Sequence, residues 1–327
     1  MLSGEEADLF ARWNPLGFIL FARNVRDPGQ VAALVRDLRQ AVGRDDAPVL
    51  VDQEGGRVQR LRPPAWRAAP AASRFAGLHA SDPAAACEAA RLNARLIAAE
   101  CLALGIDVVC SPCADVPAPG SHDVIGDRAH GRDPGTVAAL AGAVAEGLMD
   151  LGATPVMKHM PGHGRARADS HKELPVVDAS IEDLREVDAA PFRALAGAIP
   201  WGMTAHVLFR AIDAERPATI SPACIGFIRR EIGFDGLLLS DDLGMEALGG
   251  SPLERAIAAL AAGCDVALHC DGVLATAREL LPAIPALGEE GMRRLSSSRR
   301  RVSRRVAAEV PRWQGRLDAL LQGGAGR

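Results

Sequence analysis

Polar and charged side chains follow directly after several short apolar runs in this sequence. Asp52 follows one such run, Lys158 and His159 follow a second, His206 follows a third and Asp241 follows a fourth. If these runs are parallel strands, their carboxyl ends meet on one face, and the side chains converge on a single rim. Carboxylate, ammonium and imidazole groups at one rim suit acid–base or nucleophilic chemistry. The sequence therefore predicts an active site there rather than a solvated surface.

Asp241 is the first candidate for a nucleophile. It comes shortly after the most apolar run, residues 236–239. A carboxylate in that place suits attack on a carbon centre or stabilisation of an oxocarbenium ion. Asp242 is the competing candidate, because neighbouring residues of a strand point to opposite faces and only one of the two is expected to face the site. The residues alone leave this choice open.

The sequence Asp169-Ser170-His171 is a candidate acid–base unit. A carboxylate two residues from a histidine can orient the imidazole and increase its basicity. The unit lies in a long loop, rich in Gly, Arg and Ala, that follows the Lys158 strand. Long loops over the mouth of a barrel tend to carry function, which favours this pair over an ordinary surface pair.

Cationic candidates accompany these groups. Arg60 and Arg128 suit a clamp on a carboxylate or on sugar hydroxyls, and Asp52 suits a hydrogen bond to a sugar hydroxyl. Only Lys158 and Lys172 among the 37 basic residues are lysines, and the rest are arginines. An ammonium and a guanidinium are not interchangeable at a tight site, so a lysine retained in this chain indicates a chemical requirement.

Other polar residues are interpreted as structural. Arg57 suits an ion pair with Glu54 as well as it suits a ligand contact. The arginines within residues 293–305 are flanked by glutamates without an aromatic platform, which indicates a solvated helix face and no nucleic-acid site. The histidines without a surrounding motif, predicted to be non-functional, are His79, His122, His130 and His269.

The elements that must position the candidates alternate between strand and helix. Apolar runs typical of doubly buried parallel strands occupy residues 17–21, 48–51, 106–110, 154–157, 202–205, 236–239 and 264–268. Helical patterns occupy residues 27–42, 82–104, 133–151, 181–196, 221–232, 251–262, 289–309 and 312–321. This repetition predicts an α/β fold of the TIM-type (β/α)8 barrel class, although only seven strands are counted.

Composition excludes several classes of protein. The 327 residues are 48% hydrophobic and 24% charged, as in ordinary globular chains. We expect no membrane span and no secretory signal, and the net charge of −4 gives no general attraction to nucleic acid. Seven scattered cysteines favour a reduced, cytoplasmic protein. The spacing of Cys110 and Cys113 lacks a second pair, so we expect no metal and no cofactor.

Six motifs in series carry a resemblance to a known family. GFILFARN, VDQEGGRVQRL, IGDRAHG, KHMPGHGRARADSHKELP, MTAHVLF and GLLLSDDLGM occur in this order between about Leu9 and Asp271. Together they resemble the family 3 glycoside hydrolases. Within that family they are similar to the single-domain β-N-acetylglucosaminidases of bacterial cell-wall recycling, to which KH-x-PGHG followed by D-S-H is highly specific.

The resemblance implies a role for each matching residue. Asp241 matches the family nucleophile, His171 the unusual histidine general acid/base and Asp169 its partner. The positions that match residues holding the N-acetylglucosamine ring are Asp52, Arg60, Arg128, Lys158 and His159. We add His206 as an expected substrate-binding residue because it also follows a strand.

The implied activity is that of a retaining exo-β-N-acetylglucosaminidase. Such an enzyme removes terminal β-linked N-acetylglucosamine from muropeptide or peptidoglycan fragments through a covalent glycosyl-enzyme, in the cytoplasm and without a metal. Two rival functions remain: a glycoside phosphorylase that uses the same Asp241 and His171, and an inactive sugar-binding barrel. The substrate is a small molecule in each case, and no nucleic acid or membrane partner is expected.

The amino-terminal end departs from the family pattern. Family members carry a short apolar strand before the E-E-x-x-x-F helix, whereas here only residues 1–4 precede Glu5. The count of seven runs agrees, so we expect a barrel whose first strand is missing. We further expect residues 1–327 to form a single catalytic domain with C-terminal helices at about 289–321, acting as a monomer.

Overall fold

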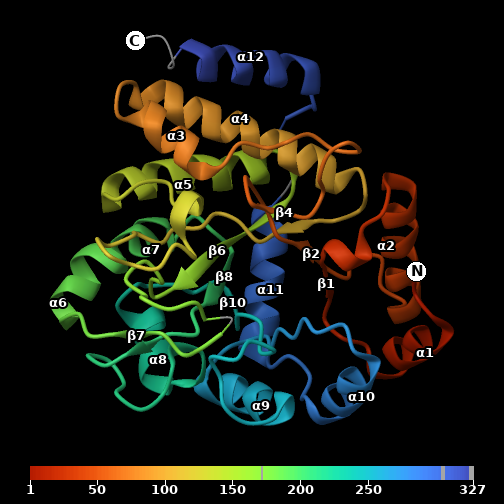
Figure 1. The fold of residues 1–327 in the computed structure, drawn as a ribbon. Helices are drawn as coiled ribbons and strands as arrows, with labels where there is room; N and C mark the ends of the chain where they lie inside the picture. Colours follow the sequence, from red (N-terminus) through yellow and green to blue (C-terminus); the bar gives the residue numbers. More distant parts are fainter. Residues whose placement is uncertain (171, 303–305, 324–327) are drawn as a thin grey trace.

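The computed structural model describes residues 1–170, 172–302 and 306–323, and its centre is one curled parallel sheet (Figure 1). Six strands pair in the order of the sequence, so each β–α unit adds a strand beside the previous one. The strands are β1(Phe18–Leu20), β2(Val49–Val51), β5(Val108–Val109), β6(Thr154–Met160), β8(Trp201–Thr204) and β10(Leu237–Leu239). All neighbours are parallel, which confirms the predicted α/β class.

Within the described residues the sheet does not close into an eight-stranded barrel. The expected strand at residues 264–268 contributes only a parallel bridge between Leu239 and Val266. Across the remaining gap, the Arg23 guanidinium, just after β1, donates to the Cys270 carbonyl at 2.5 Å. A side chain thus connects the two ends of the arc where a strand would pair. The expected (β/α)8 barrel is therefore observed as a curled sheet with seven strand positions.

Helices surround the sheet. In the described chain they are α1(Gly4–Trp13), α2(Pro28–Val42), α3(Ala72–His79), α4(Pro83–Leu102), α5(Pro134–Leu151), α6(Ile181–Asp183), α7(Ala190–Leu195), α8(Pro222–Arg230), α9(Pro252–Ala262), α10(Leu274–Ala283), α11(Glu289–Arg301) and α12(Val310–Gly323). An Asp or Ser cap followed by proline begins α2, α4, α5, α8 and α9, as the sequence predicts. None of these described helices is long and apolar enough to cross a bilayer.

Three helical expectations need correction. The helix expected at residues 181–196 is divided by a π-helical turn, Leu184–Asp188, between α6 and α7. Pro191 contributes to this break because it has no N–H to donate to the carbonyl one turn earlier. The helix expected at residues 289–309 ends at Arg301. Finally, α3 and α10 were not expected, since neither begins with a side-chain cap.

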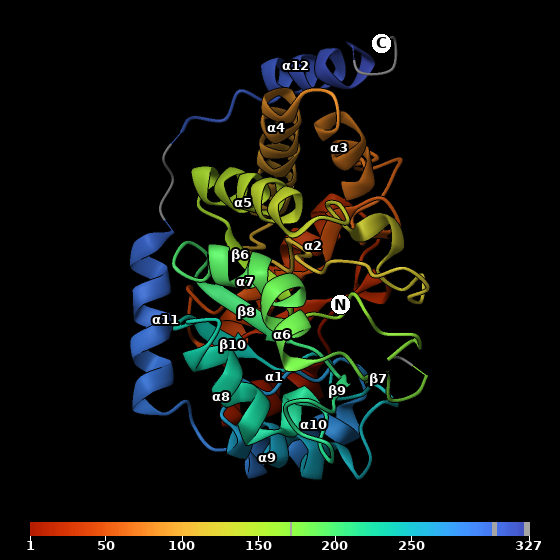
Figure 2. The same ribbon diagram turned by 90° about the vertical axis from the view of Figure 1, so that its left-hand side faces the viewer.

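The core on one face of the strands also includes the C-terminal part of the chain. Leu50, Val156 and Leu295 of α11 belong to one buried cluster. The Trp201 indole donates to the Ser298 hydroxyl of α11 at 2.9 Å. Figure 2 shows α11 running beside the sheet, and α12 lying over α4, against which it packs.

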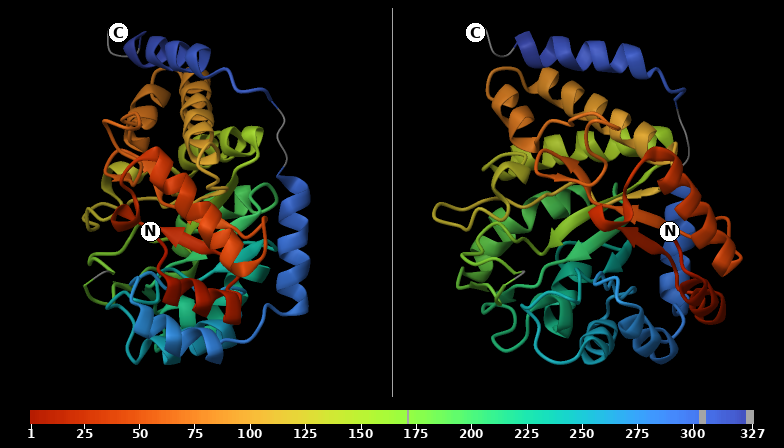
Figure 3. Two further views of the ribbon diagram at one scale, coloured as in Figure 1. Left: turned by 90° about the vertical axis from the view of Figure 1, so that its right-hand side faces the viewer. Right: turned by 45° about the vertical axis from the view of Figure 1, so that its right-hand side comes forward.

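The first helix packs near the end of the β–α series. Figure 3 shows α1 beside α10, and Arg278 of α10 forms an ion pair with Glu5 of α1 at 2.6 Å. Segments far apart in the sequence thus meet on the side of the molecule where the arc of strands is open.

Loops after the main strands contain small strands of their own. Directly after β2, β3(Gln53–Gly55) pairs antiparallel with β4(Val58–Gln59). After β6 and β8, β7(Val176–Val177) pairs parallel with β9(Leu208–Phe209). This backbone pairing gives the rim loops a defined shape, and they contain most of the candidate site residues.

Candidate active site

A cleft of about 130 Å³ opens among the loops at the C-terminal ends of the strands. One part of its wall is polar, and another is apolar with Phe21, Met203 and Leu268. The sequence-predicted site residues that line it are Asp52, Arg60, Arg128, Lys158, His159 and Asp241. The structure therefore brings these six side chains together at the rim.

Lys158 lies between two carboxylates. Its Nζ is 2.8 Å from Asp52 Oδ1 and 2.8 Å from Glu54 Oε1, and its side chain is only 3% exposed. Burial acts to lower the pKa of Lys158, but the two carboxylates outweigh burial and raise this pKa above its ordinary value. The ammonium group is therefore charged at neutral pH, and two of its three N–H bonds point at protein carboxylates.

Two arginines complete this charged array. Arg128 forms a two-pronged ion pair with Glu54, at 2.8 and 3.0 Å, and Arg60 donates to Asp52 Oδ2 at 3.0 Å. Burial acts to raise the pKa values of Asp52 and Glu54, but the adjacent cations lower both below their ordinary values. Three cations and two carboxylates leave a net positive charge at this end of the cleft.

Local strand geometry explains why both acids reach the same lysine. Asp52 and Glu54 are two residues apart where β2 continues into β3, and side chains at that spacing share a face. The pairing of Glu54 with Arg57 considered from the sequence is wrong. Arg57 instead forms ion pairs with Asp123 and Asp127, each at 3.0 Å.

Asp241 lines the cleft just beyond β10. Its Oδ1 accepts the backbone N–H of Asp242 at 2.8 Å, and its own N–H donates to Thr204 Oγ1 at 3.3 Å. Burial acts to raise the pKa of Asp241, but His206, His159 and the Asp242 N–H lower it below the ordinary value. The carboxylate is therefore ionised at neutral pH, as a nucleophile requires.

Asp242 lines the cleft as well, which corrects the expectation that only one of the two acids faces the site. The strand ends at Leu239, so the alternation of side chains no longer applies at these positions. Asp242 Oδ1 accepts the backbone N–H groups of Gly244 and Cys270, at 2.8 and 3.0 Å. Asp242 thus holds its own loop together, and Asp241 is the acid less engaged by the protein.

His206 is not among the described residues that line the cleft, and its expected contact with substrate stays a prediction. It is fully buried, with Nδ1 2.7 Å from Thr219 Oγ1 and Nε2 2.8 Å from the Asp242 carbonyl. Burial lowers the pKa of His206 below its ordinary value. With both ring nitrogens paired to protein atoms, His206 supports the loop that carries the two acids.

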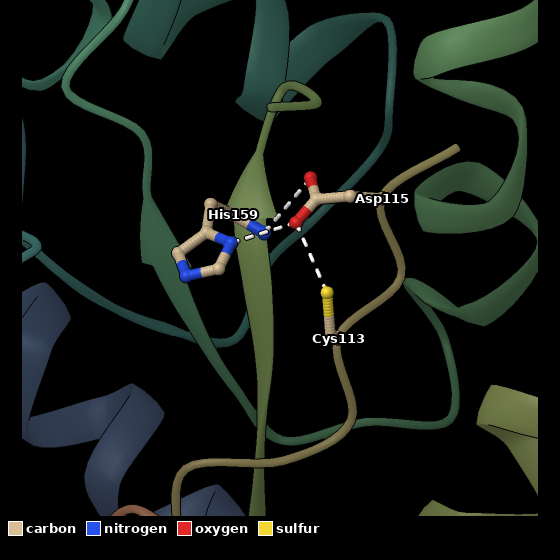
Figure 4. A group of neighbouring side chains, drawn as sticks. All are labelled: Cys113, Asp115 and His159. Atoms are coloured by element: carbon tan, nitrogen blue, oxygen red, sulfur yellow. Dashed lines mark hydrogen bonds and ion pairs between the residues drawn. The ribbon is translucent and has the colours of Figure 1, made fainter. Parts of the chain in front are cut away.

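His159 is held from behind by Asp115, a residue that the sequence did not single out. The His159 Nδ1 lies 2.7 Å from Asp115 Oδ2, and the Cys113 thiol lies 3.2 Å from the same oxygen. Figure 4 shows the three side chains turned toward one another. Asp115 Oδ1 accepts the backbone N–H groups of His159 and His163, at 3.3 and 2.6 Å. Burial acts to raise the pKa of Asp115, but His159 and these bonds lower it, so the acid is ionised.

The same three side chains are of types that bind zinc, and their donor atoms lie within 4.8 Å of one another. Both Asp115 oxygens, however, are already occupied by N–H and S–H donors. The Arg128 guanidinium lies 3.4 Å from the other His159 ring nitrogen, and burial raises the pKa of the Cys113 thiol well above its ordinary value. These features favour a hydrogen-bonded support for His159 over a cation site.

The loop after β6 carries the predicted acid–base unit. Asp169 is partly exposed, and its carbonyl accepts the backbone N–H groups of Lys172 and Glu173, at 2.9 and 3.1 Å. Ser170 is buried and lines the cleft. His171 lies outside the described residues, so its predicted role stays a prediction.

Three residues of the site were not assigned from the sequence. Glu54 had a recognisable signal, since its spacing from Asp52 places both on one face of a strand. Asp115 had none, because its histidine partners are 44 and 48 residues away along the chain. His163 belongs to the PGHG motif but was given no role, and the structure places it in the cleft wall.

Known proteins are similar to this chain over most of its length. Residues 3–305 match the family described as the glycosyl hydrolase family 3 N terminal domain. A β-hexosaminidase of Methylococcus capsulatus is 40% identical over 98% of this chain and 95% of the relative. A second, from Alkalilimnicola ehrlichii, is 43% identical over 83% of this chain and 78% of the relative.

A solved structure is also similar over its whole length. NagZ from Neisseria gonorrhoeae, in complex with N-trifluoroacetyl-D-glucosamine, superposes with a TM-score of 0.85 and 32% sequence identity. The alignment covers 99% of this chain and 95% of that protein. The overall fold is therefore shared with a relative solved in complex with an N-acylated glucosamine.

Proposed function

The chain belongs to glycosyl hydrolase family 3 and is a β-N-acetylhexosaminidase, and from that premise we propose that it is a retaining exo-enzyme. Its substrates are muropeptide or peptidoglycan fragments with a terminal β-linked N-acetylglucosamine. The observation that carries this proposal is an ionised, lightly engaged carboxylate, Asp241, in a cleft whose other end is positively charged. That combination suits a polar, uncharged sugar ring held beside a nucleophile.

The reaction proceeds in two steps. In the first, an Asp241 oxygen forms a bond to the anomeric carbon while the glycosidic C–O bond breaks, and the departing oxygen takes a proton from the His171 imidazolium. In the second, water gives a proton to the neutral imidazole and attacks the anomeric carbon, which releases the Asp241 carboxylate. Two displacements at one carbon retain its configuration.

A histidine in place of a second carboxylate suits this sequence of steps. When the imidazole is neutral, it does not repel an anionic group near the sugar, whereas a second carboxylate does. Asp169 favours the protonated imidazole and so maintains the acid form that the first step consumes.

The charged array holds the sugar. Asp52 and Lys158 suit hydroxyl groups on one edge of the ring, with Arg60 and Arg128 beside them, and His159 presents its Nε2 side to the cleft. Lys158 and Arg128 already pair with Asp52 and Glu54. The other N–H bonds of these two cations serve as donors to the sugar and need no large rearrangement.

The leaving group gives the decisive test. In His171→Ala, a methyl N-acetylglucosaminide should lose far more activity than a nitrophenyl glycoside, whose leaving group needs little protonation, and the glycosyl-enzyme should accumulate. Asp169→Ala should show the same pattern more weakly. Equal losses on both substrates, with no accumulated intermediate, contradict the acid/base assignment. Absence of any turnover by the unaltered chain, with sugar binding intact, contradicts the enzymatic proposal.

The setting of the enzyme is also part of this proposal. We place it in the cytoplasm, on the ground that all seven cysteines are free thiols. We further propose that residues 1–327 act as one catalytic unit, supported by the packing of α11 on the sheet core and α12 on α4. We also propose that the chain acts as a monomer, and light scattering on the purified chain measures this oligomeric state directly.

A further inference from the structure

The His163 side chain connects two parts of the cleft that the mechanism uses separately. Its ring is 3% exposed, and its Nε2 lies 3.2 Å from the hydroxyl oxygen of Ser170, which is also 3% exposed. The His163 and His159 rings meet edge to face, with centroids 5.7 Å apart. The His163 imidazole thus contacts both His159, at the strand end proposed to bind the sugar, and Ser170, in the loop after β6.

We infer that His163 and Ser170 are positioning residues, whose hydrogen bond holds the loop at Asp169 and Ser170 against the cleft. The inference rests on the proposed function, in which Asp169 and His171 supply the acid and base. Ser170 directly follows Asp169 in the sequence, so a bond from its side chain restrains the backbone next to Asp169.

The fixed end of this connection is Asp115. Its Oδ1 accepts the His163 backbone N–H at 2.6 Å, and its Oδ2 lies 2.7 Å from the His159 ring. Asp115 itself is fully buried, so the carboxylate has little freedom to move. The same acid therefore sets the orientation of His159 toward the sugar and the start of the loop that carries the acid–base unit.

Ser170 has a second attachment on the opposite side of the cleft. Its carbonyl accepts the backbone N–H of Ala247 at 3.3 Å, in the loop that follows Asp241 and Asp242. The segment beside the acid–base pair is thus tied to the sugar-binding strand end through His163 and to the nucleophile loop through Ala247. Such a geometry restrains Ser170, and with it the neighbouring Asp169, relative to the loop that carries Asp241.

The state of the His163 ring fits a positioning role. Burial and the neighbouring His159 lower the pKa of His163 to about 4. The ring is therefore neutral at the near-neutral pH at which a histidine general acid/base works. A neutral ring can hold a hydroxyl group without placing a further charge beside the sugar-binding cations. It also does not compete with His171 as a proton donor at neutral pH.

The experiment compares poor and good leaving groups in variants of the full chain. Ser170→Ala and His163→Asn should lose about 10- to 100-fold in kcat/KM on a methyl N-acetylglucosaminide, the size expected for a misplaced general acid. On a dinitrophenyl glycoside the loss should stay below about threefold, because that leaving group needs little protonation. Ser170→Thr keeps the hydroxyl and should restore most of the lost activity.

Ser298→Ala is the matched control. It removes a buried hydroxyl that bonds the Trp201 indole on the far side of the sheet. It should lower the melting temperature without changing the ratio of the two activities. If Ser170→Ala does not fold, His163→Asn still tests the inference, because it removes the ring nitrogen that bonds the Ser170 hydroxyl.

Two results overturn the inference in distinguishable ways. If Asp169→Ala and His171→Ala show the leaving-group pattern but Ser170→Ala and His163→Asn do not, the positioning role is wrong and the proposed function stands. If none of the four shows the pattern, the acid/base assignment is wrong and the positioning role is lost with it.

Discussion

The surroundings of Lys158 explain why a lysine occupies this position in an arginine-rich chain. Its ammonium group fits between Asp52 and Glu54 at 2.8 Å from each, in a place where the side chain is 3% exposed. Glu54 also receives both prongs of the Arg128 guanidinium. A second planar guanidinium at position 158 has no room to lie beside the first without displacing one of the acids.

We therefore expect Lys158→Arg to be harmful although it keeps the charge. kcat/KM for a nitrophenyl N-acetylglucosaminide should fall at least about tenfold, which corresponds to about 1.4 kcal/mol of transition-state stabilisation. Lys172→Arg, at the other lysine of the chain, is the control, because that side chain is exposed. Kinetic constants for Lys158→Arg equal to those of the unaltered enzyme contradict the argument.

Asp241 and Asp242 differ in what they bind, which allows the nucleophile to be tested against its neighbour. Asp241→Asn should abolish turnover, because it removes several kcal/mol of transition-state stabilisation. The melting temperature of this variant should stay near that of the unaltered chain. Asp242→Asn should lower the melting temperature more, because it weakens the bonds to Gly244 and Cys270. A larger loss of turnover in Asp242→Asn than in Asp241→Asn overturns the assignment.

At the scale of elements, the loop after β6 depends on a close approach of two backbones. A Cβ added at Gly164 would lie 2.0 Å from the Val116 carbonyl oxygen, and the Gly164 carbonyl accepts the Ala118 N–H at 2.9 Å. Because backbone atoms form both sides of this contact, no side-chain rotation can relieve a clash. The glycine is what allows the loop to lie against the segment that carries Asp115.

We expect Gly164→Ala to move the loop away from that segment. The free energy of unfolding should fall by about 1–3 kcal/mol, the usual cost of overpacking, and turnover should fall with it. Gly197→Ala is the matched control, since its added Cβ would meet nothing within 4 Å. Chemical denaturation and a chromogenic assay on both variants give the answer, and equal behaviour of the two glycines excludes the backbone contact as the cause.

At the scale of the whole molecule, buried histidines make stability depend on pH. His130 is 4% exposed behind the cleft, and its Nδ1 has no hydrogen-bond partner among the described residues. Burial lowers the pKa of His130 to about 4. The unfolded chain takes up a proton near pH 6.5, whereas the folded chain resists it until about pH 4, so stability is lost as the pH falls through this window.

The expected loss can be measured against a variant. Between pH 7 and pH 5 the unaltered chain should lose about 2 kcal/mol more free energy of unfolding than His130→Gln, because the variant lacks this titration. Urea denaturation at the two pH values measures the difference. His122→Gln, at an exposed position, should follow the unaltered chain, and parallel pH profiles for His130→Gln and the unaltered chain contradict the prediction.

The sequence by itself determined the order of the main strands, most of the helices between them, and the face expected to carry the site. Six of the seven apolar runs are strands in the predicted places, because their signals are local: short apolar runs, Asp–Pro and Ser–Pro caps, and glycines after helices. The convergence of Asp52, Lys158 and Asp241 followed from the same pattern. Parallel strands in sequence order leave only one rim on which residues after the strands can meet.

Only the tertiary structure decided which side chains pair and which face the cleft. Arg23 meets Cys270 across the open arc, 247 residues away, and Asp115 supports His159 across 44 residues. His206 follows a strand as Lys158 does, yet its ring turns into the core and bonds Thr219. Such contacts depend on how whole elements lie relative to one another. Packing between distant segments fixes that arrangement, so a local sequence pattern does not predict it.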